Sequence, residues 1–214
     1  MYFLTEKLWF PEVSEADSDG LLAVGGDLSV ERLKLAYRSG IFPWYGDAQP
    51  IMWWSPNPRM LLFPDKLHVS KNLQKKINKR NFTVTFNNNF AEVIRQCANV
   101  PRPDQGGTWI TEDMEAAYIK LHQGGIATSV EVWLDGKLVG GLYGVDLPDK
   151  KIFCGESMFS GVSDASKIAL YHLVEALKKK EYKFIDCQMY TEHLARMGAE
   201  EVSRERFMAY LSER

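Results

Sequence analysis

The 214-residue sequence predicts an α+β fold in which a small, irregular N-terminal domain packs on a larger domain built around an antiparallel sheet. Three observations lead to this prediction. The first 64 residues are rich in Trp, Pro and Gly, whereas helical and β-rich patterns alternate regularly after them. The dipeptide Asp135-Gly136 joins two β-rich runs, which is a strong hairpin signal. A long amphipathic helix then lies between two apolar strands. We therefore divide the chain into residues 1–64 and 65–214.

The N-terminal domain has one clear helix among turns. That helix begins after Ser29, a residue type that caps helix N-termini, and ends at about Arg38, with Gly40 just beyond it. Prolines and glycines force turns in the segments around it, which are Gly20–Ser29, Gly40–Tyr45 and Met52–Arg59. We therefore expect a compact but irregular unit.

The larger domain has a regular order of elements. We expect a basic helix over 70–80, a strand over 82–86, helices over 90–98 and 112–123, hairpin strands over 128–134 and 137–145, a strand over 151–159, a helix over 164–180, a strand over 184–188 and two short helices. The helix over 164–180 has apolar side chains at helical spacing. Three lysines close it, as the helix dipole favours.

This order of elements matches the N-acetyltransferase superfamily. The match implies that the two strands flanking the long helix splay apart and that the acyl donor lies between them. We therefore expect the chemistry on Phe153–Met158 and Ile185–Gln188. Users of acyl-CoA in that superfamily bind pyrophosphate on an Arg/Gln- and Gly-containing loop before the long helix. The equivalent segment, Ser160–Lys167, has one glycine and no arginine, so we expect an acyl donor other than CoA.

The composition limits the kinds of binding partner that the chain could have. With 45% hydrophobic and 25% charged residues and a net charge of -2, the chain is globular, and only a local patch could hold a nucleic acid. The three cysteines lie far apart without metal-ligand spacing, so we expect reduced thiols and no metal site. An acid and a lysine interrupt the apolar N-terminal segment, and no run approaches the roughly 18 apolar residues of a membrane span. We expect a soluble, cytoplasmic protein that binds no membrane.

Six segments, in order along the chain, resemble the bacterial leucyl/phenylalanyl-tRNA–protein transferases. They are GLLAVGGDLS (Gly20–Ser29), YRSGIFPWY (Tyr37–Tyr45), IMWWSPNPR (Ile51–Arg59), GGTWIT (Gly106–Thr111), IFCGESMFS (Ile152–Ser160) and the Asp186-x-Gln188 pair. The resemblance implies Leu- or Phe-tRNA as donor, with Met-tRNA poorer, and a protein with N-terminal Arg or Lys as acceptor. The product would be marked for degradation. The resemblance also implies no metal or organic cofactor, and we expect a monomer.

Aromatic side chains crowd into the N-terminal domain. Phe42 and Trp44 match family positions near the substrate pocket, although either could simply be core. For Trp53 and Trp54 we expect a core role. Trp109 could stack on the terminal adenine of tRNA, a contact worth about 1–3 kcal/mol.

An apolar pocket for Leu and Phe side chains needs apolar residues on the cleft strands and the long helix. The candidates are Leu142, Phe153, Met158, Leu170, Leu173, Leu177 and Ile185. Gly155 and Ser157 of the CGESMFS segment complete the expected substrate-binding set. Core packing explains some of these residues. Such pockets discriminate by only about 1–3 kcal/mol per methylene, so some acceptance of Met fits.

The segment Lys66–Arg80 is basic and contains no acid. Its helix is expected to contact the tRNA acceptor stem through Lys71, Lys75, Lys76, Lys79 and Arg80. Like charges at i, i+4 repel one another, and a phosphate backbone would relieve that repulsion. The alternative is an ordinary solvated helix face.

The candidate catalytic residues are Asp186, Gln188 and Glu156. Asp186 and Gln188 are two residues apart on a strand, so we expect them on one face with Cys187 on the other. Glu156 would enter the cleft from the neighbouring strand. His193 is the reserve candidate for a general base, although a structural role is the expectation for it.

The reaction indicates what these side chains would do. An aminoacyl ester is already activated, and an α-amino group has a pKa of about 7.7–8.0, so alignment is the main requirement. Asp186 would orient the amine, and the amide oxygen of Gln188 would accept its hydrogen bond. The proton would pass to the ribose oxygen. Glu156 would anchor the Arg or Lys side chain of the acceptor or support the Asp186 network.

Three other functions stay open at this point. The first is a CoA-dependent N-acetyltransferase, which the missing pyrophosphate loop opposes. The second is a non-catalytic RNA-binding module that uses the basic helix and Trp109. The third is a Fem-type cell-wall transferase, another enzyme that forms peptide bonds from aminoacyl-tRNA.

Overall fold

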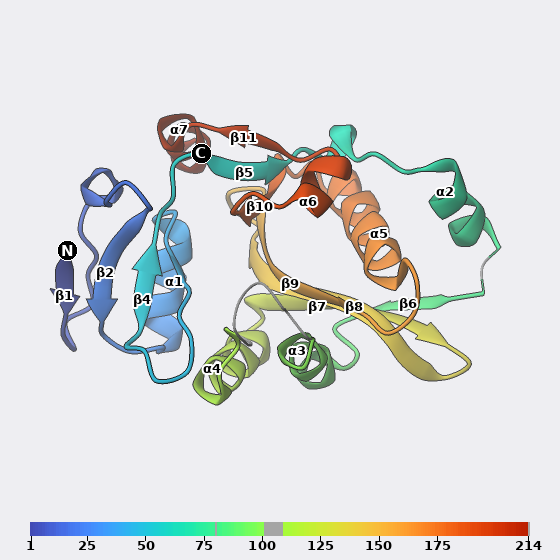
Figure 1. Cartoon of the computed structure of the whole chain (residues 1–214), viewed down its shortest axis with the longest axis horizontal. Coiled ribbons are helices and arrows are strands. Elements are labelled where there is room, and N and C mark those ends of the chain that lie inside the picture. The colour runs from blue at the N-terminus through green and yellow to red at the C-terminus, as the bar shows by residue number, and fades with distance from the viewer. Residues whose placement is uncertain (80, 101–108, 214) are drawn as a thin grey trace.

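The computed structural model describes residues 1–79, 81–100 and 109–213. Within these residues the strands form one sheet of four strands and one of seven. Figure 1 shows the smaller sheet and helix α1 at one end of the molecule, and the larger sheet with its helices at the other. The predicted α+β fold, with a small N-terminal domain next to an acetyltransferase-like domain, is confirmed.

The smaller sheet has the strand order β1-β2-β4-β3. Its elements are β1 (Tyr2–Leu4), the short 3-10 helix η1 (Val13–Glu15), β2 (Leu21–Gly25), α1 (Val30–Arg38), β3 (Phe42–Pro43) and β4 (Met52–Trp54). The Ser29 side chain caps α1 by accepting from the Arg32 backbone N at 3.3 Å, as predicted. Trp53 is fully buried and donates to the Gly25 carbonyl at 2.8 Å, which confirms its core role.

The larger sheet has the order β11-β5-β10-β9-β8-β7-β6. Its strands are β5 (Arg59–Leu62), β6 (Thr83–Phe86), β7 (Ala127–Leu134), β8 (Lys137–Leu147), β9 (Ile152–Ser160), β10 (Phe184–Gln188) and β11 (Glu200–Val202). Among its described pairings only β9 and β10 run parallel. The short strands β5 and β11 were not predicted from the sequence, because neither strand, at four and three residues, shows a periodic pattern.

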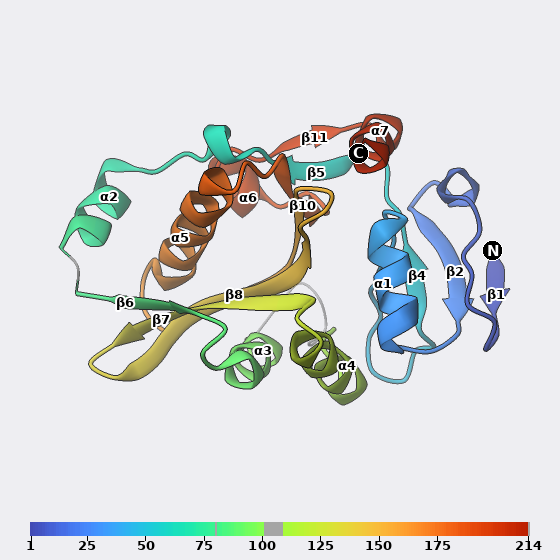
Figure 2. The same ribbon diagram turned by 180° about the vertical axis from the view of Figure 1, so that it is seen from behind.

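Helices cover both faces of the larger sheet. They are α2 (Lys71–Asn78), α3 (Phe90–Ala98), α4 (Glu112–Gln123), α5 (Ala165–Lys179), α6 (Glu192–Arg196) and α7 (Arg204–Ser212), with the 3-10 helix η2 (Pro64–Lys66). Helix α5 packs on one face, and α3 and α4 pack on the other, as Figure 2 shows from behind. The predicted Asp135-Gly136 hairpin is confirmed, and both residues have the positive φ of a type I′ turn, 51° and 74°.

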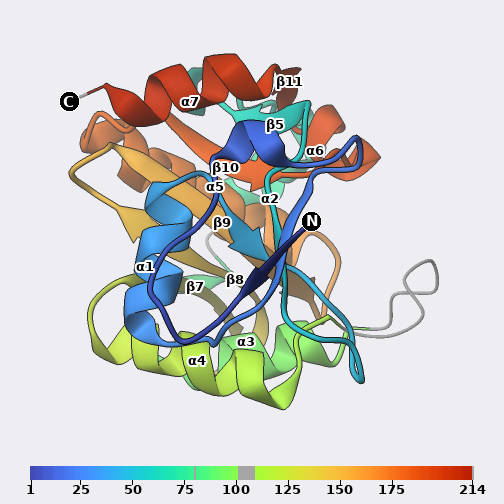
Figure 3. The ribbon, with the colours of Figure 1, turned by 90° about the vertical axis from the view of Figure 1, so that its left-hand side faces the viewer.

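Two hydrophobic clusters hold the molecule together. One joins the smaller sheet, α1, α3 and α4 to one face of the larger sheet, and the other lies between that sheet and α5. Figure 3 shows α1 and α4 side by side where the two domains meet. The division at residues 64 and 65 stays a prediction; β5, which precedes that point, pairs with β10 and β11 in the larger sheet. No helix in the described part of the chain is long and apolar enough to cross a membrane.

Candidate active site

The strands β9 and β10 separate where the predicted catalytic residues lie. Their parallel pairing ends at Asp186 opposite Cys154. Each strand also bulges here: β9 places Glu156 as an extra residue against β8, and β10 places Cys187 as an extra residue against β5. Gln188 adopts a left-handed backbone conformation, with φ of 60°. Bulges and left-handed residues re-aim side chains and gather at functional sites.

A cavity of about 550 Å³ lies at this separation. Its lining includes most of the predicted site residues, namely Phe42, Trp44, Trp109, Leu142, Phe153, Gly155, Glu156, Ser157, Met158, Leu170, Leu173, Ile185 and Gln188. The apolar lining residues come from both hydrophobic clusters, so the cavity reaches from the α5 side of the sheet to the side of the N-terminal domain. The structure thus brings together residues that lie between positions 42 and 188 of the chain.

One predicted pocket residue lies elsewhere. Leu177 is 4% exposed and belongs to the core between α5 and the sheet, and it is not among the described residues that line the cavity. Leu173, one turn earlier on α5, does line it. Helical spacing identifies the buried face of α5, but it does not indicate where along that face the cavity ends.

Glu156 and Gln188 are joined across the gap between the two strands. The Gln188 Nε2 donates to Glu156 Oε1 at 2.9 Å, and the Tyr118 hydroxyl donates to Glu156 Oε2 at 3.2 Å. Tyr118 in turn shares a short hydrogen bond with Tyr37 of α1. Burial raises the pKa of the Glu156 carboxyl to about 7, and the nearby Asp186 charge adds to this, while its hydrogen bonds oppose the rise.

Asp186 occupies a different position from the one that the sequence predicted. Asp186 is 1% exposed and pairs with Arg59, with Oδ1 2.8 Å from Nε and Oδ2 2.7 Å from Nη2. Cys187 and Gln188 line the cavity, whereas Asp186 is not among its described lining residues. The expectation that Asp186 and Gln188 face the cleft together, with Cys187 opposite, is therefore wrong. The bulge at Cys187 breaks the two-residue alternation on which it depended.

Three further residues of the site were not identified from the sequence. Arg59 and Tyr37 lie within segments that carry the family resemblance, but their partners are 127 and 81 residues away in the chain. Tyr118 lies on α4 without any distinctive motif. Only the fold brings these side chains to Glu156 and Asp186. His193, the reserve base, does line the cavity, and burial lowers its pKa, as do the neighbouring charges of Lys167 and Arg196.

Among the described residues, the lysines of the basic helix fall into two groups, exposed side chains without an ion pair and one that is paired. Lys71, Lys75 and Lys79 are exposed, and no ion pair involves them within the part of the chain that the structure describes. Lys76 instead pairs with Asp164 at 2.5 Å. Arg80 lies outside the described residues, as do Gly106–Thr108 of the GGTWIT segment.

The cavity combines an apolar compartment with a polar pair of side chains. An apolar compartment adjoins a carboxylate–amide pair at the point where an acetyltransferase-like sheet opens. In the described part of the chain no group of three or more His, Cys, Asp or Glu side chains is arranged to hold a metal ion. This arrangement is suited to the transfer of an acyl group that carries an apolar side chain.

Comparison with known proteins gives the family. The chain matches the family model described as leucyl/phenylalanyl-tRNA protein transferase over residues 61–212, and the model of its N-terminal domain over residues 26–57. The leucyl/phenylalanyl-tRNA–protein transferases of Flavobacterium johnsoniae and Christiangramia forsetii are 57% and 55% identical to it. Each alignment covers 99% of this chain, and 99% and 100% of those proteins respectively. The chain belongs to the leucyl/phenylalanyl-tRNA–protein transferase family, and it transfers Leu or Phe to N-terminal residues of proteins.

Solved structures show a more distant likeness. A ribosomal-protein-alanine N-acetyltransferase from Brucella melitensis biovar Abortus 2308 is 13% identical, with a TM-score of 0.38. That alignment covers 52% of this chain and 82% of the other.

Proposed function

We propose that the enzyme moves Leu or Phe, and Met less well, from aminoacyl-tRNA to proteins that begin with Arg or Lys, and so marks them for degradation. The observation that supports this most is the position of Glu156. It contributes the only carboxylate among the described residues that line the cavity. An acceptor that brings a cation would pair with Glu156, and this pairing would also favour its ionised form.

The apolar part of the cavity would hold the donor side chain. Leu142, Phe153, Leu170, Leu173 and Ile185 line it, and all of them are nearly fully buried. A polar side chain there would lose its hydrogen bonds to water without replacement. A methionine would fit at a modest cost, because apolar pockets discriminate weakly.

The aromatic residues at the other side of the cavity would receive the end of the tRNA. Trp44 and Trp109 both line the cavity and are only partly buried, so their rings are accessible to a base. In this proposal Trp109 stacks on the terminal adenine and Phe42 and Trp44 close the donor site.

The catalytic step would depend on alignment. The neutral α-amine of the acceptor attacks the ester carbonyl, the C–N bond forms, the C–O bond to the ribose breaks, and the amine proton ends on the ribose oxygen. The Gln188 amide oxygen accepts a hydrogen bond from the attacking amine. Asp186 acts indirectly, because its Oδ1 accepts from the Gln188 backbone N at 3.0 Å and so fixes that residue. Alignment of this kind can supply several kcal/mol.

The tRNA acceptor stem would lie along α2. The exposed lysines 71, 75 and 79 form one stripe at i, i+4 spacing, and they would neutralise backbone phosphates.

A CoA-dependent acetyltransferase is the rival function. The segment before α5, Ser160–Lys167, has one glycine and no arginine, so it lacks the loop on which such enzymes bind pyrophosphate. A thermal-shift measurement with acetyl-CoA tests the rival directly, and we expect no stabilisation.

The proposal is tested with radiolabelled Leu-tRNA and three peptides identical except for N-terminal Arg, Lys or Ala. We expect label on the Arg and Lys peptides and none on the Ala peptide. Equal labelling of all three would contradict the proposed role of Glu156. Transfer to none of them would contradict the proposed acceptor class.

A further inference from the structure

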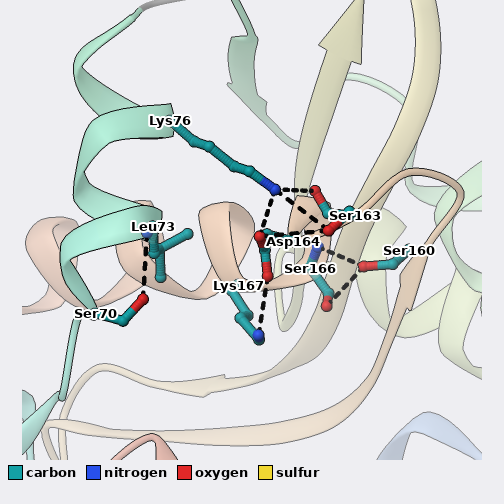
Figure 4. A network of polar contacts seen from close by, with 8 residues as sticks. All are labelled: Ser70, Leu73, Lys76, Ser160, Ser163, Asp164, Ser166 and Lys167. Carbon is teal, nitrogen blue, oxygen red and sulfur yellow. Dashed lines mark hydrogen bonds and ion pairs between the residues drawn. The ribbon is translucent and has the colours of Figure 1, made fainter.

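Asp164 holds two lysines from different helices at the junction of α2 and α5 (Figure 4). Its Oδ2 accepts from Lys76 Nζ at 2.5 Å, and its Oδ1 accepts from Lys167 Nζ at 2.9 Å. Lys76 Nζ also donates to the Ser163 hydroxyl at 3.2 Å and to the Ser163 carbonyl at 3.4 Å. A single carboxylate therefore fixes both ammonium groups.

The position of Asp164 would ordinarily give its side chain another task. It is the N-cap residue of α5, where aspartate usually accepts from the backbone of the first turn, but no such bond forms. Its backbone is left-handed, with φ of 70°. Ser160 of β9 takes over the cap, since its Oγ accepts from the Ser166 backbone N at 2.9 Å. The carboxylate is thereby available to the lysines.

The cluster joins α2, which carries the basic stripe, to α5, which contributes residues to the cavity lining. Lys76 belongs to α2, the helix that carries the exposed Lys71, Lys75 and Lys79. Lys167 is three residues before Leu170 on α5, so the two share one helix face, and Leu170 lines the cavity. A strand running from α2 into the cavity would pass this cluster.

The three charged groups together carry an excess of one positive charge. The side chain of Asp164 is 21% exposed, whereas those of Lys76 and Lys167 are 39% and 35% exposed. The hydrogen bonds from the two lysines lower the pKa of Asp164 to about 2, so the carboxylate is ionised at neutral pH. The anion is thus turned inward, and the cations stay accessible to solvent.

We propose that Asp164 is a positioning residue for the donor tRNA: it holds Lys76 and Lys167 in place for phosphates of the strand that leads from α2 to the cavity. Lysine side chains lose considerable rotamer freedom when they bind a phosphate, and pre-ordering them reduces that loss. This inference rests on the proposed contact between α2 and tRNA.

The substitution Asp164→Asn separates positioning from simple charge. Asparagine keeps the size of the side chain and tolerates a left-handed backbone, but it removes the negative charge. If only net charge mattered, loss of an anion would tighten tRNA binding. Positioning predicts the opposite: an increase in the KM for Leu-tRNA of about fivefold with unchanged kcat, near the upper end of what exposed ion pairs contribute. Asp65→Asn is the matched control, because Asp65 is exposed and pairs with Lys178 at 3.5 Å.

Two further measurements complete the test. A leucyl-adenosine ester has no phosphates, so D164N should use it as well as the wild type does, which also shows that the active site is intact. In a K76Q/K167Q background D164N should have no further effect, because Asp164 acts through these lysines. A lower or unchanged KM for Leu-tRNA in D164N would overturn the inference. An increase in the KM for the leucyl-adenosine ester as large as that for Leu-tRNA would also overturn it. The K71Q/K75Q/K79Q variant is assayed in parallel: an unchanged KM there would overturn the proposed α2 contact itself, independently of Asp164.

Discussion

The guanidinium of Arg59 and the carboxylate of Asp186 form a buried, bidentate ion pair. The two residues are 127 positions apart in the chain. The guanidinium lies over the rings of Phe42 and Phe207, with its Cζ 4.9 and 4.5 Å from their centroids, and donates to the Gly40 carbonyl at 3.2 Å. The pair thus connects the N-terminal domain to strand β10. Because both Asp186 oxygens are bonded to Arg59, this carboxylate is suited to hold the site together rather than to accept the substrate's proton.

Asp186→Asn is expected to lower both stability and turnover. The buried Arg59 would keep its charge without a counter-ion, and breaking such a pair costs about 3–5 kcal/mol. Urea unfolding measures the stability, and single-turnover transfer from Leu-tRNA measures the rate. The affinity for tRNA should stay unchanged. A variant that kept wild-type stability but lost turnover would indicate instead that Asp186 acts directly on the substrate.

Glu156→Gln is expected to stabilise the free enzyme above pH 7. The folded-state pKa of Glu156 is about 7, above its ordinary value of 4.5, so the folded protein binds the extra proton between these pH values. Wild-type stability is therefore lost as the pH rises through this window, by about 3 kcal/mol at most, and the variant escapes this loss. Urea unfolding at pH 5, 6, 7 and 8 should show a difference that grows with pH. The exposed Glu201→Gln is the control, and a difference independent of pH for E156Q would contradict the prediction.

Leu173→Phe is expected to shift the donor preference from Phe towards Leu. The larger ring fills part of the cavity that the Phe side chain would occupy, and such a change is worth about 1–3 kcal/mol. The ratio of kcat/KM for Leu-tRNA to that for Phe-tRNA should rise about tenfold or more. Leu177→Phe makes the same change one turn further along α5, in the core, and should affect stability without changing the ratio. An equal shift in both variants would contradict the boundary of the pocket.

The K71Q/K75Q/K79Q variant is expected to bind aminoacyl-tRNA more weakly and with less dependence on salt. Each lost lysine–phosphate contact should reduce the slope of log affinity against log salt concentration by about one, so the triple variant should lose about three. A variant with three exposed lysines replaced elsewhere, K34Q/K120Q/K137Q, is the matched control. Equal slopes for the two variants would show that α2 is an ordinary solvated face.

Features that depend on neighbours in the chain could be predicted from the sequence. The Asp135-Gly136 hairpin and the capped helix after Ser29 are local, and their residue types encode the turn and the cap. The order of elements then led to the separating strands, and so to most of the cavity lining.

Features that depend on distant partners could not be predicted. Nothing near Arg59 indicates that Asp186 will meet it, and nothing near Tyr118 indicates Glu156. The bulge at Cys187 places both Cys187 and Gln188 at the cavity and separates Gln188 from Asp186, and a regular two-residue pattern cannot reveal a single extra residue. The pairing of Lys76 with Asp164 likewise depends on how α2 packs against α5.

Positioning of the amine by Gln188, without a protein base, is tested most directly by the pH dependence of single-turnover transfer. The acceptors are Arg peptides whose second residue is acidic, neutral or basic, so that the titrated pKa of the α-amino group varies along the series. If alignment of a neutral amine is what the site provides, the pH at which the rate levels off follows that α-amino pKa from peptide to peptide. A break that stays at one pH throughout the series would contradict this mechanism and identify a titrating group of the protein, such as Glu156 or His193, as the base.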